Sequence, residues 1–106
     1  MKRKYYKEPD SVILDLPGAK DISLRVIIGH EDGAPNFTML LLEIAPGGHG
    51  PSHTHPWEEI IFVKSGTGEV KSGDETRPLG PGTAVFFAPN EPHQFLNTGT
   101  ELLEFL

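Results

Sequence analysis

The sequence contains no cysteine, which excludes disulfide bonds, thiolate metal ligands and cysteine nucleophiles. Any metal ion would therefore need nitrogen and oxygen ligands. Basic residues are also few, since 9 Lys and Arg stand against 15 Asp and Glu and give a net charge of −6. A chain with this charge is poorly suited to following nucleic-acid phosphates, so we expect no nucleic-acid partner.

Long hydrophobic runs are absent as well. The longest apolar stretch is a handful of residues around positions 39–42, far short of the roughly 18 residues that a membrane-spanning helix needs. Several basic residues at positions 2–7 are followed by Glu-Pro-Asp at positions 8–10, where a signal peptide would require an apolar segment. We therefore expect a cytoplasmic protein without a membrane partner.

A chain of 106 residues is long enough for one domain, which we place at residues 1–106. Gly and Pro together make up 22 residues, about a fifth of the chain. Short β-branched or aromatic runs alternate with these turn residues, which is typical of an all-β sandwich or barrel. The runs predict eight strands, at residues 12–14, 24–28, 37–44, 59–63, 68–71, 84–88, 93–96 and 101–105.

Two of these predicted strands carry further expectations. Residues 37–44 are almost wholly apolar, which favours a strand covered on both faces, with a partner subunit on one of them. The apolar residues at 101–105 predict a paired strand rather than a frayed end, because a free segment would expose its side chains.

Four residues form a candidate metal site. His53 and His55 are two apart, so on an extended strand both imidazoles project from one face. Glu59 follows in phase with them, and His93 begins another predicted strand. If these strands are neighbours in a barrel, three imidazoles and one carboxylate converge inside it.

This donor set suits one divalent transition metal ion per chain, and Mn, Fe, Ni, Zn, Co and Cu all stay open. Three neutral imidazoles and one carboxylate would reduce the charge of the ion to about +1, leaving it Lewis acidic. Four protein ligands on one side of an octahedron would leave two positions for water, dioxygen or a bidentate small-molecule ligand. The pattern therefore indicates an open metal site rather than a closed structural one.

The spacing of these residues resembles that of the cupins. Their first motif has a Gly, five residues, His-x-His, three or four residues, Glu, six residues and a Gly; Gly47, His53, His55, Glu59 and Gly66 fit every position.

The second cupin motif has a Gly, five residues, Pro-x-Gly, two residues, His, three residues and an Asn. Gly82, His93 and Asn97 keep this spacing. The chain departs from the motif with Ala88 in place of Pro and Asn90 in place of Gly. Asn tolerates the left-handed backbone that a turn glycine would supply, so we expect the turn to form.

The resemblance implies a cupin-type double-stranded β-helix, also called a jelly-roll barrel, with a metal ion inside and usually a homodimer. The segments APNF at 34–37, HPWEE at 55–59 and PNEPH at 89–93 look more narrowly like small single-domain prokaryotic cupins of the cupin-2 type. Members of that group are often labelled oxalate-decarboxylase-like without a demonstrated substrate. A shared fold does not by itself name a reaction.

For other residues near the motifs, the sequence gives weaker support for a functional role. His49 could carry protons at the mouth of the site, although a solvated loop histidine is the simpler interpretation. Glu58 should point away from Glu59, and Glu91 could overhang the pocket, so no acid or base is identified. Ile61 and Phe95 are in phase with the ligands and could line a substrate pocket or simply fill the core. Trp57 could cap the core or an interface.

Two functions from different classes follow. The first is a metal-dependent enzyme, an oxidoreductase of the dioxygenase kind or a decarboxylating lyase, acting on a small oxygen-rich or dicarbonyl compound. The second is a non-catalytic module that uses the same metal to bind or sense a small molecule. A third interpretation is a barrel kept for assembly with an incidental metal ion.

Overall fold

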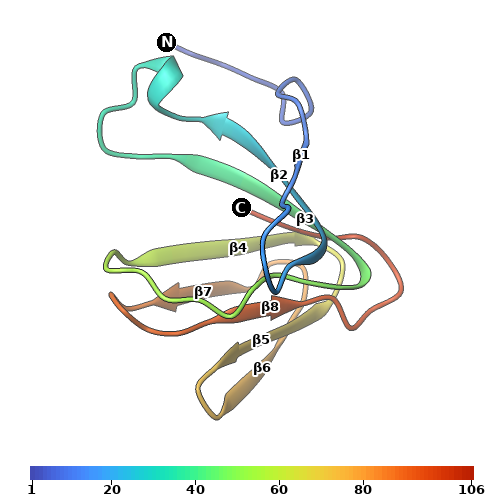
Figure 1. Cartoon of the computed structure of the whole chain (residues 1–106). Helices are drawn as coiled ribbons and strands as arrows, with labels where there is room; N and C mark the ends of the chain where they lie inside the picture. Colours follow the sequence, from blue (N-terminus) through green and yellow to red (C-terminus); the bar gives the residue numbers. More distant parts are fainter.

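The structure is a computed structural model that describes residues 1–106, and it consists almost entirely of β-strands (Figure 1). A single 3-10 turn, η1, covers His30–Asp32. No helix is long and apolar enough to cross a membrane. The nine strands are β1 Val12–Ile13, β2 Lys20–Ile28, β3 Met39–His49, β4 Glu59–Ser65, β5 Gly68–Ser72, β6 Glu75–Leu79, β7 Ala84–Phe87, β8 Gln94–Leu96 and β9 Leu103–Phe105.

The strands form one curled antiparallel sheet in the order β6-β5-β8-β3-β9-β4-β7, and β2 also pairs with β3 and carries β1 at its edge. In Figure 1 the β2–β3 hairpin rises on one side, while β4, β7 and β8 lie together below it and β5–β6 forms the opposite end. The predicted all-β barrel class is confirmed by this architecture.

The C-terminal strand β9 lies between β3 and β4. Leu42 is opposite Phe105 on one side, and Val63 is opposite Phe105 on the other. Leu103 and Phe105 are fully buried, so the prediction of a paired rather than frayed end is confirmed, although the strand begins at residue 103 instead of 101.

Alternating residues on the strands fill the inside of the curl. On β4, for example, Ile61 and Val63 are buried while Ile60 and Phe62 are exposed, as the two-residue period of a strand requires. Burial of an aliphatic or aromatic side chain contributes about 1.5–3 kcal/mol, so this cluster is the main source of stability. Its ten residues are Ile22, Ile44, Ile61, Val63, Val70, Leu79, Phe87, Phe95, Leu103 and Phe105.

The sequence prediction missed β6. Residues 75–79, which include Pro78, are not among the eight predicted strands, yet they pair with β5 along their whole length. Proline is tolerated there because β6 is the last strand in the sheet order and one of its edges needs no partner.

The expectation for residues 37–44 was partly wrong. The strand starts at Met39, and Phe37 is exposed ahead of it. Leu41 is fully buried, but Leu40 and Leu42 on the alternate face are only half-buried. Both faces of the strand are therefore only partly covered by the single chain, since exposed Met39 shares the face of Leu41 and fully buried Ile44 shares the face of Leu40 and Leu42.

Candidate metal centre

Two segments distant in sequence bring the candidate ligands together. His53 and His93 form an isolated bridge in which each backbone N–H donates to the other residue's carbonyl, at 3.1 and 3.0 Å. The backbone N–H of Asn90 also donates to the carbonyl of His55 at 2.7 Å. These bonds fix the loop before β4 against the loop before β8.

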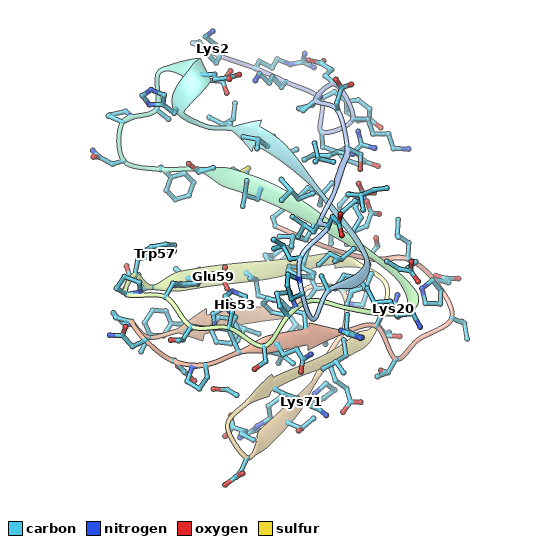
Figure 2. All side chains as sticks on the ribbon, in the orientation of Figure 1. Lys2, Lys20, His53, Trp57, Glu59 and Lys71 are labelled. Atoms are coloured by element: carbon cyan, nitrogen blue, oxygen red, sulfur yellow. The ribbon has the colours of Figure 1, made fainter.

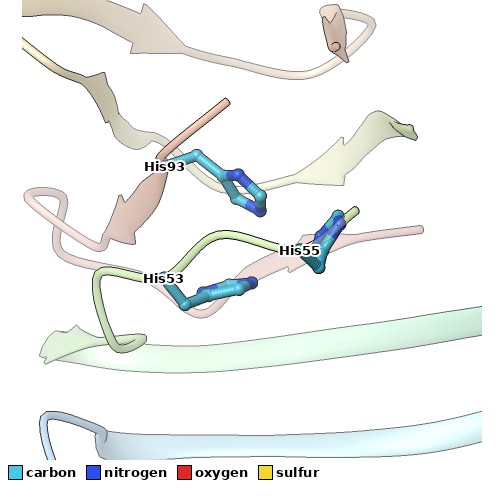
Figure 3. Close-up of side chains that lie close together, drawn as sticks. All are labelled: His53, His55 and His93. Atoms are coloured by element: carbon cyan, nitrogen blue, oxygen red, sulfur yellow. The ribbon is translucent and has the colours of Figure 1, made fainter. Parts of the chain in front are cut away.

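The three imidazoles converge on one point (Figure 3). Their ligand atoms all lie within 4.8 Å of one another, close enough for His53, His55 and His93 to hold one metal ion. Burial differs among them, because His93 is only 1 % exposed whereas His53 is exposed. The group therefore reaches from the core to the surface, which leaves an open side.

A backbone carbonyl within two residues orients each ring. The Nδ1 atoms of His53, His55 and His93 lie 3.1, 2.7 and 2.9 Å from the carbonyl oxygens of Pro51, Trp57 and Glu91 respectively. A carbonyl can only accept, so Nδ1 carries the proton and Nε2 keeps its lone pair. Hydrogen bonds of this kind set the tautomer and the orientation of metal-binding histidines.

The Glu59 carboxylate faces the same point. Its Oε2 lies 2.9 Å from Nε2 of His93, and its Oε1 lies 3.9 Å from Nε2 of His55. The short contact with His93 does not have the geometry of a hydrogen bond, so both buried atoms are left without a hydrogen-bond partner.

Those two unpartnered atoms provide the test of whether a metal ion fits. Buried polar atoms without partners are rare in proteins, and here one nitrogen and one oxygen face the same region. With bonds of about 2.1 Å, two ligand atoms at right angles around an ion are about 3 Å apart. The observed 2.9 Å agrees with that spacing, so the residues fit a divalent transition metal.

Aromatic rings pack against two of the histidines. The ring of Phe87 stacks on His93 with centroids 4.2 Å apart and planes at 17°. Trp57 stacks on His55 with centroids 4.7 Å apart and planes at 10°. Phe87 is buried, while Trp57 is 64 % exposed, and Figure 2 shows it at the same end of the molecule as Glu59 and His53.

The turn before His93 forms as the sequence predicted. Asn90 takes the left-handed conformation with φ 66°, the role expected of it in place of a glycine. The Glu91 carboxylate accepts hydrogen bonds from the Ala88 backbone N–H at 3.0 Å and the Ser72 hydroxyl at 2.8 Å. These bonds, in that order, hold the pKa of Glu91 below its usual value. Glu91 thus closes the turn.

The remaining candidates lie as follows. His49 ends β3 and is not one of the converging histidines; its Nδ1 lies 3.2 Å from the Gly50 carbonyl. Glu58 is exposed just before β4. Ile61 and Phe95 are buried in the core cluster, and the Phe95 ring centroid lies 5.8 Å from that of His93.

Two hollows in the structure are not lined by the three imidazoles. A hollow of about 670 Å³ lies between the N-terminal segment and β2, lined by Lys4, Leu24 and Asp32 among others. A second of about 490 Å³ between β5–β6 and β7 includes Phe87 and Glu91, the neighbours of His93. One histidine of the candidate centre, His53, is exposed.

Sequence reasoning did not identify the supporting residues. Phe87 could have been found, because it directly opposes Glu59 on the neighbouring strand and so shares its inner face. The backbone carbonyls that orient the rings had no signal in the sequence, because any residue type supplies a carbonyl.

Comparisons with known proteins agree with the fold. A family model described as "Cupin domain" matches residues 40–106. The polyketide cyclase RemF from Streptomyces resistomycificus has a structure that superposes with a TM-score of 0.92 and 34% sequence identity, covering 99% of this chain and 75% of that one.

Two further similarities are more limited. A predicted oxalate decarboxylase from Thermotoga maritima superposes with a TM-score of 0.85 at 24% identity, covering 95% of this chain and 91% of that one, which shows a common fold. The dimethylsulfoniopropionate lyase DddQ from Ruegeria pomeroyi is 46% identical over 44 residues. That match spans 41% of this chain and about a fifth (22%) of the length of the lyase.

Proposed function

This chain belongs to the cupin family, and from that premise we propose that it is a metal-dependent enzyme whose divalent ion is held by His53, His55, Glu59 and His93. The observation that carries the proposal is the convergence of three imidazoles whose Nδ1 atoms are each bonded to a backbone carbonyl. Their Nε2 atoms are thereby kept free as lone-pair donors.

When bound, the ion supplies Lewis acidity to an oxygen-rich or dicarbonyl compound. The chain itself supplies the position of the ion and the surroundings of the substrate. The imidazoles and the carboxylate are already in place before the ion binds. Phe87 and Phe95 form an apolar wall beside His93. This wall excludes water from the inner side, so a substrate would approach from the side of exposed His53. We propose that Ile61 and Phe95 line the inner side of the substrate pocket.

The reaction classes that we favour are oxidation by dioxygen and decarboxylation. Decarboxylation also needs a proton for the carbanion that the departing carbon dioxide leaves behind. Glu91 closes its turn and Glu58 is exposed just before β4, so water at the open side of the site would have to supply that proton. The likeness to a polyketide cyclase adds ring closure of a polycarbonyl compound to the reactions worth assaying.

The metal proposal is tested by elemental analysis of natively purified protein. Wild type should carry close to one transition metal ion per chain, and His53→Ala should lose at least nine-tenths of it. His53 is exposed, so removing its ring leaves the core intact. His49→Ala is the matched control, because His49 is outside the cluster and should keep the metal. Equal metal in wild type and His53→Ala would refute the ligand assignment.

The choice between enzyme and binding module needs a turnover assay. Dioxygen uptake and carbon dioxide release would be followed on small dicarbonyl compounds, polyol acids and polycarbonyl compounds, with the metal-loaded protein and with His53→Ala. Turnover that requires the loaded site supports the enzyme. A ligand-dependent rise in melting temperature without turnover would instead support the binding or sensing module.

Three other expectations stay predictions. We propose that residues 1–106 form a single domain, that the protein acts in the cytoplasm and that it works as a homodimer. Fractionation of the source cells would test the location, and the absence of cysteine is compatible with a reducing compartment.

A further inference from the structure

His93 is the most deeply buried of the four candidate ligands, being 1 % exposed. The backbone bridge to His53 holds its main chain in place, but it does not set the direction of the ring. The Nε2 atom, which would face the ion, makes no hydrogen bond. The direction of its lone pair therefore depends on the contacts made by the rest of the ring.

Stacking alone does not set this direction. Phe87 lies against the ring of His93 with planes at 17°, which fixes the plane of the imidazole. A half-turn about χ2 keeps the same plane, and this torsion of histidine is roughly two-fold. The half-turn would exchange Nε2 with Cε1 and Nδ1 with Cδ2, so the lone pair would leave the site. Only the hydrogen bond from Nδ1 to the Glu91 carbonyl, at 2.9 Å, distinguishes the two orientations.

The Glu91 carbonyl is itself held by the Glu91 side chain. One carboxylate oxygen accepts a hydrogen bond from the backbone N–H of Ala88 at 3.0 Å, and the other accepts one from the hydroxyl of Ser72 at 2.8 Å. The backbone N–H of Glu91 in turn donates to the Ala88 carbonyl at 3.1 Å. Two reciprocal bonds thus close the turn at residues 88–91, and a third connects this turn to another strand.

That third bond links the β5–β6 hairpin to the candidate centre. Ser72 is the last residue of β5, and its neighbour Lys71 is opposite Gln94, the residue after His93. The hairpin lies next to β8 in the sheet (Figure 1). A movement of β5 would therefore be transmitted to the turn that precedes His93.

The carbonyls that orient the other two histidines have no comparable tie. Pro51, which accepts from His53, has no polar side-chain atom. Trp57, which accepts from His55, acts on that ring directly through its stacked indole. Of the three imidazoles, only that of His93 depends on a side-chain hydrogen bond to a distant part of the chain.

We propose that Glu91 is a positioning residue for His93. Its carboxylate, bonded to Ser72 and to the Ala88 N–H, keeps the Glu91 carbonyl where it accepts the Nδ1 proton, and the Nε2 lone pair of His93 is thereby directed at the site. The inference rests on the proposed function, because it concerns how a candidate ligand is presented to the ion. Glu91 acts through its hydrogen bonds and not as an acid or base.

The first measurement is made on the metal-free protein. Proton–nitrogen correlation spectra at about pH 8, where imidazoles are neutral, distinguish a proton on Nδ1 from one on Nε2. Wild-type His93 should be in the Nδ1–H form. In Glu91→Ala the Nε2–H form should become detectable, at about a tenth of the population or more, because the carbonyl is no longer held in place. An unchanged His93 spectrum in folded Glu91→Ala would overturn the proposal.

Glu91→Gln should keep the wild-type spectrum. Its amide oxygen can accept from the Ala88 N–H, and its amide nitrogen can donate to the Ser72 hydroxyl oxygen. Both bonds are then kept while the charge is lost. A Glu91→Gln spectrum like that of Glu91→Ala would mean that the charge of Glu91 acts on His93, which contradicts the proposal.

Ser72→Ala tests the bond to β5 with little risk of misfolding, because Ala88 still holds the carboxylate. Ser65→Ala is the matched control: the Ser65 hydroxyl donates to the Glu104 carboxylate at 2.9 Å, at the opposite end of β4 from Glu59. Ser72→Ala should show the second tautomer of His93, although less of it than Glu91→Ala, and Ser65→Ala should not. Identical His93 spectra in the two serine variants would refute the link through β5.

The second measurement is the metal dissociation constant, obtained by competition with a chelator. Glu91→Ala should raise it about 10-fold and Ser72→Ala about 3-fold, while Ser65→Ala and Glu91→Gln stay within about 2-fold of wild type. A wild type that binds no metal would refute the proposed function, and the tautomer of metal-free His93 would still decide the role of Glu91. A changed tautomer with unchanged metal affinity would overturn the link to the site.

Discussion

The indole of Trp57 lies parallel to the imidazole of His55, and the Trp57 carbonyl accepts the hydrogen bond from Nδ1 of the same ring. One residue therefore restrains His55 in two ways. The backbone contact fixes the tautomer, while the stacked ring limits rotation of the imidazole about its χ2 bond. His55 is half-buried, between exposed His53 and buried His93.

Replacing Trp57 should weaken metal binding without changing any candidate ligand. We expect Trp57→Ala to raise the metal dissociation constant about 10-fold, because outer contacts of this kind typically alter metal affinity by 10- to 100-fold. Trp57→Phe keeps a flat ring on His55 and should stay within about 3-fold of wild type. The constants are measured by calorimetry against a competing chelator.

The control for Trp57 is Phe86→Ala, which removes another exposed aromatic ring away from the histidines. It should bind the metal as wild type does. If Trp57→Ala also bound the metal as tightly as wild type, the stacked indole would have no positioning role.

Two glycines of the first cupin motif should differ in their sensitivity to substitution. Gly47 and Gly66 both have positive φ, 79° and 83°, but a Cβ at Gly47 would meet nothing within 4 Å. A Cβ at Gly66 would collide with the backbone carbonyl of Leu102, next to β9. Gly47→Ala should therefore lose about 1 kcal/mol of unfolding free energy from backbone strain alone.

Gly66→Ala adds that steric clash to the same strain and should lose about 3 kcal/mol or more. Urea denaturation of the two variants beside wild type measures the difference. Equal losses would mean that the contact between the Gly66 turn and the segment before β9 relaxes easily.

Asn97, the last residue of the second motif, should be important for stability rather than for metal binding. It is 3 % exposed, and its Nδ2 donates to the carbonyls of Ile44 at 2.7 Å and Glu101 at 2.8 Å. Its Oδ1 accepts from the Gly99 backbone N–H at 2.9 Å. We expect Asn97→Ala to cost about 2–4 kcal/mol, because it leaves the buried carbonyl of Ile44 without a donor and breaks two further hydrogen bonds.

Thermal and urea unfolding test this expectation, with Asn36→Ala at an exposed position as the control. Metal content per folded chain should stay the same in Asn97→Ala. A variant as stable as wild type but depleted of metal would assign Asn97 to the metal centre instead.

The N-terminal segment should loosen in acid. The Lys4 ammonium, 2.6 Å from the Asp32 carboxylate, and the Gly29 backbone N–H lower the pKa of Asp32 below 3.8. A carboxyl whose folded pKa is depressed contributes stability above its unfolded pKa, and that contribution is lost as pH falls through the folded value. The link between residues 1–10 and η1 should therefore be intact above about pH 4 and weaken below it.

A nuclear magnetic resonance titration of Asp32 measures this effect directly. Wild type should titrate below the ordinary aspartate value, and Lys4→Ala should move the midpoint upward. An unchanged midpoint in Lys4→Ala would show that the Gly29 hydrogen bond alone perturbs Asp32.

Much of the fold and of the site could be predicted from the spacing of residues. The motif spacing pointed to His53, His55, Glu59 and His93. The structure places the three histidines close together, with the Glu59 carboxylate 2.9 Å from Nε2 of His93, although the histidines lie in loops rather than on strands. That these four residues bind a metal stays a prediction. The left-handed Asn90 was also predictable, since few residues other than glycine adopt that conformation readily.

The features that could not be predicted from the sequence also have physical causes. β6 was missed because a proline inside a run normally argues against a strand, and only the topology shows that residues 75–79 lie at an edge. The role of Glu91 in its turn depends on Ser72, 19 positions earlier in the chain, and no local pattern predicts such a pairing. Long-range partners of this kind are determined by packing rather than by periodicity.

The position of β9 has a consequence for how the protein is made. The β4–β7 pair joins the rest of the sheet through residues 103–105 of β9. This segment follows the other eight strands in the sequence, so the ribosome synthesises it after all of them. Before β9 is made, no backbone hydrogen bonds of the sheet connect the β4–β7 pair with β3. The apolar residues of the nascent chain therefore stay exposed until that point. Contacts between residues so far apart in sequence make folding slow, and this molecule should depend on chaperone protection during translation more than its small size would suggest.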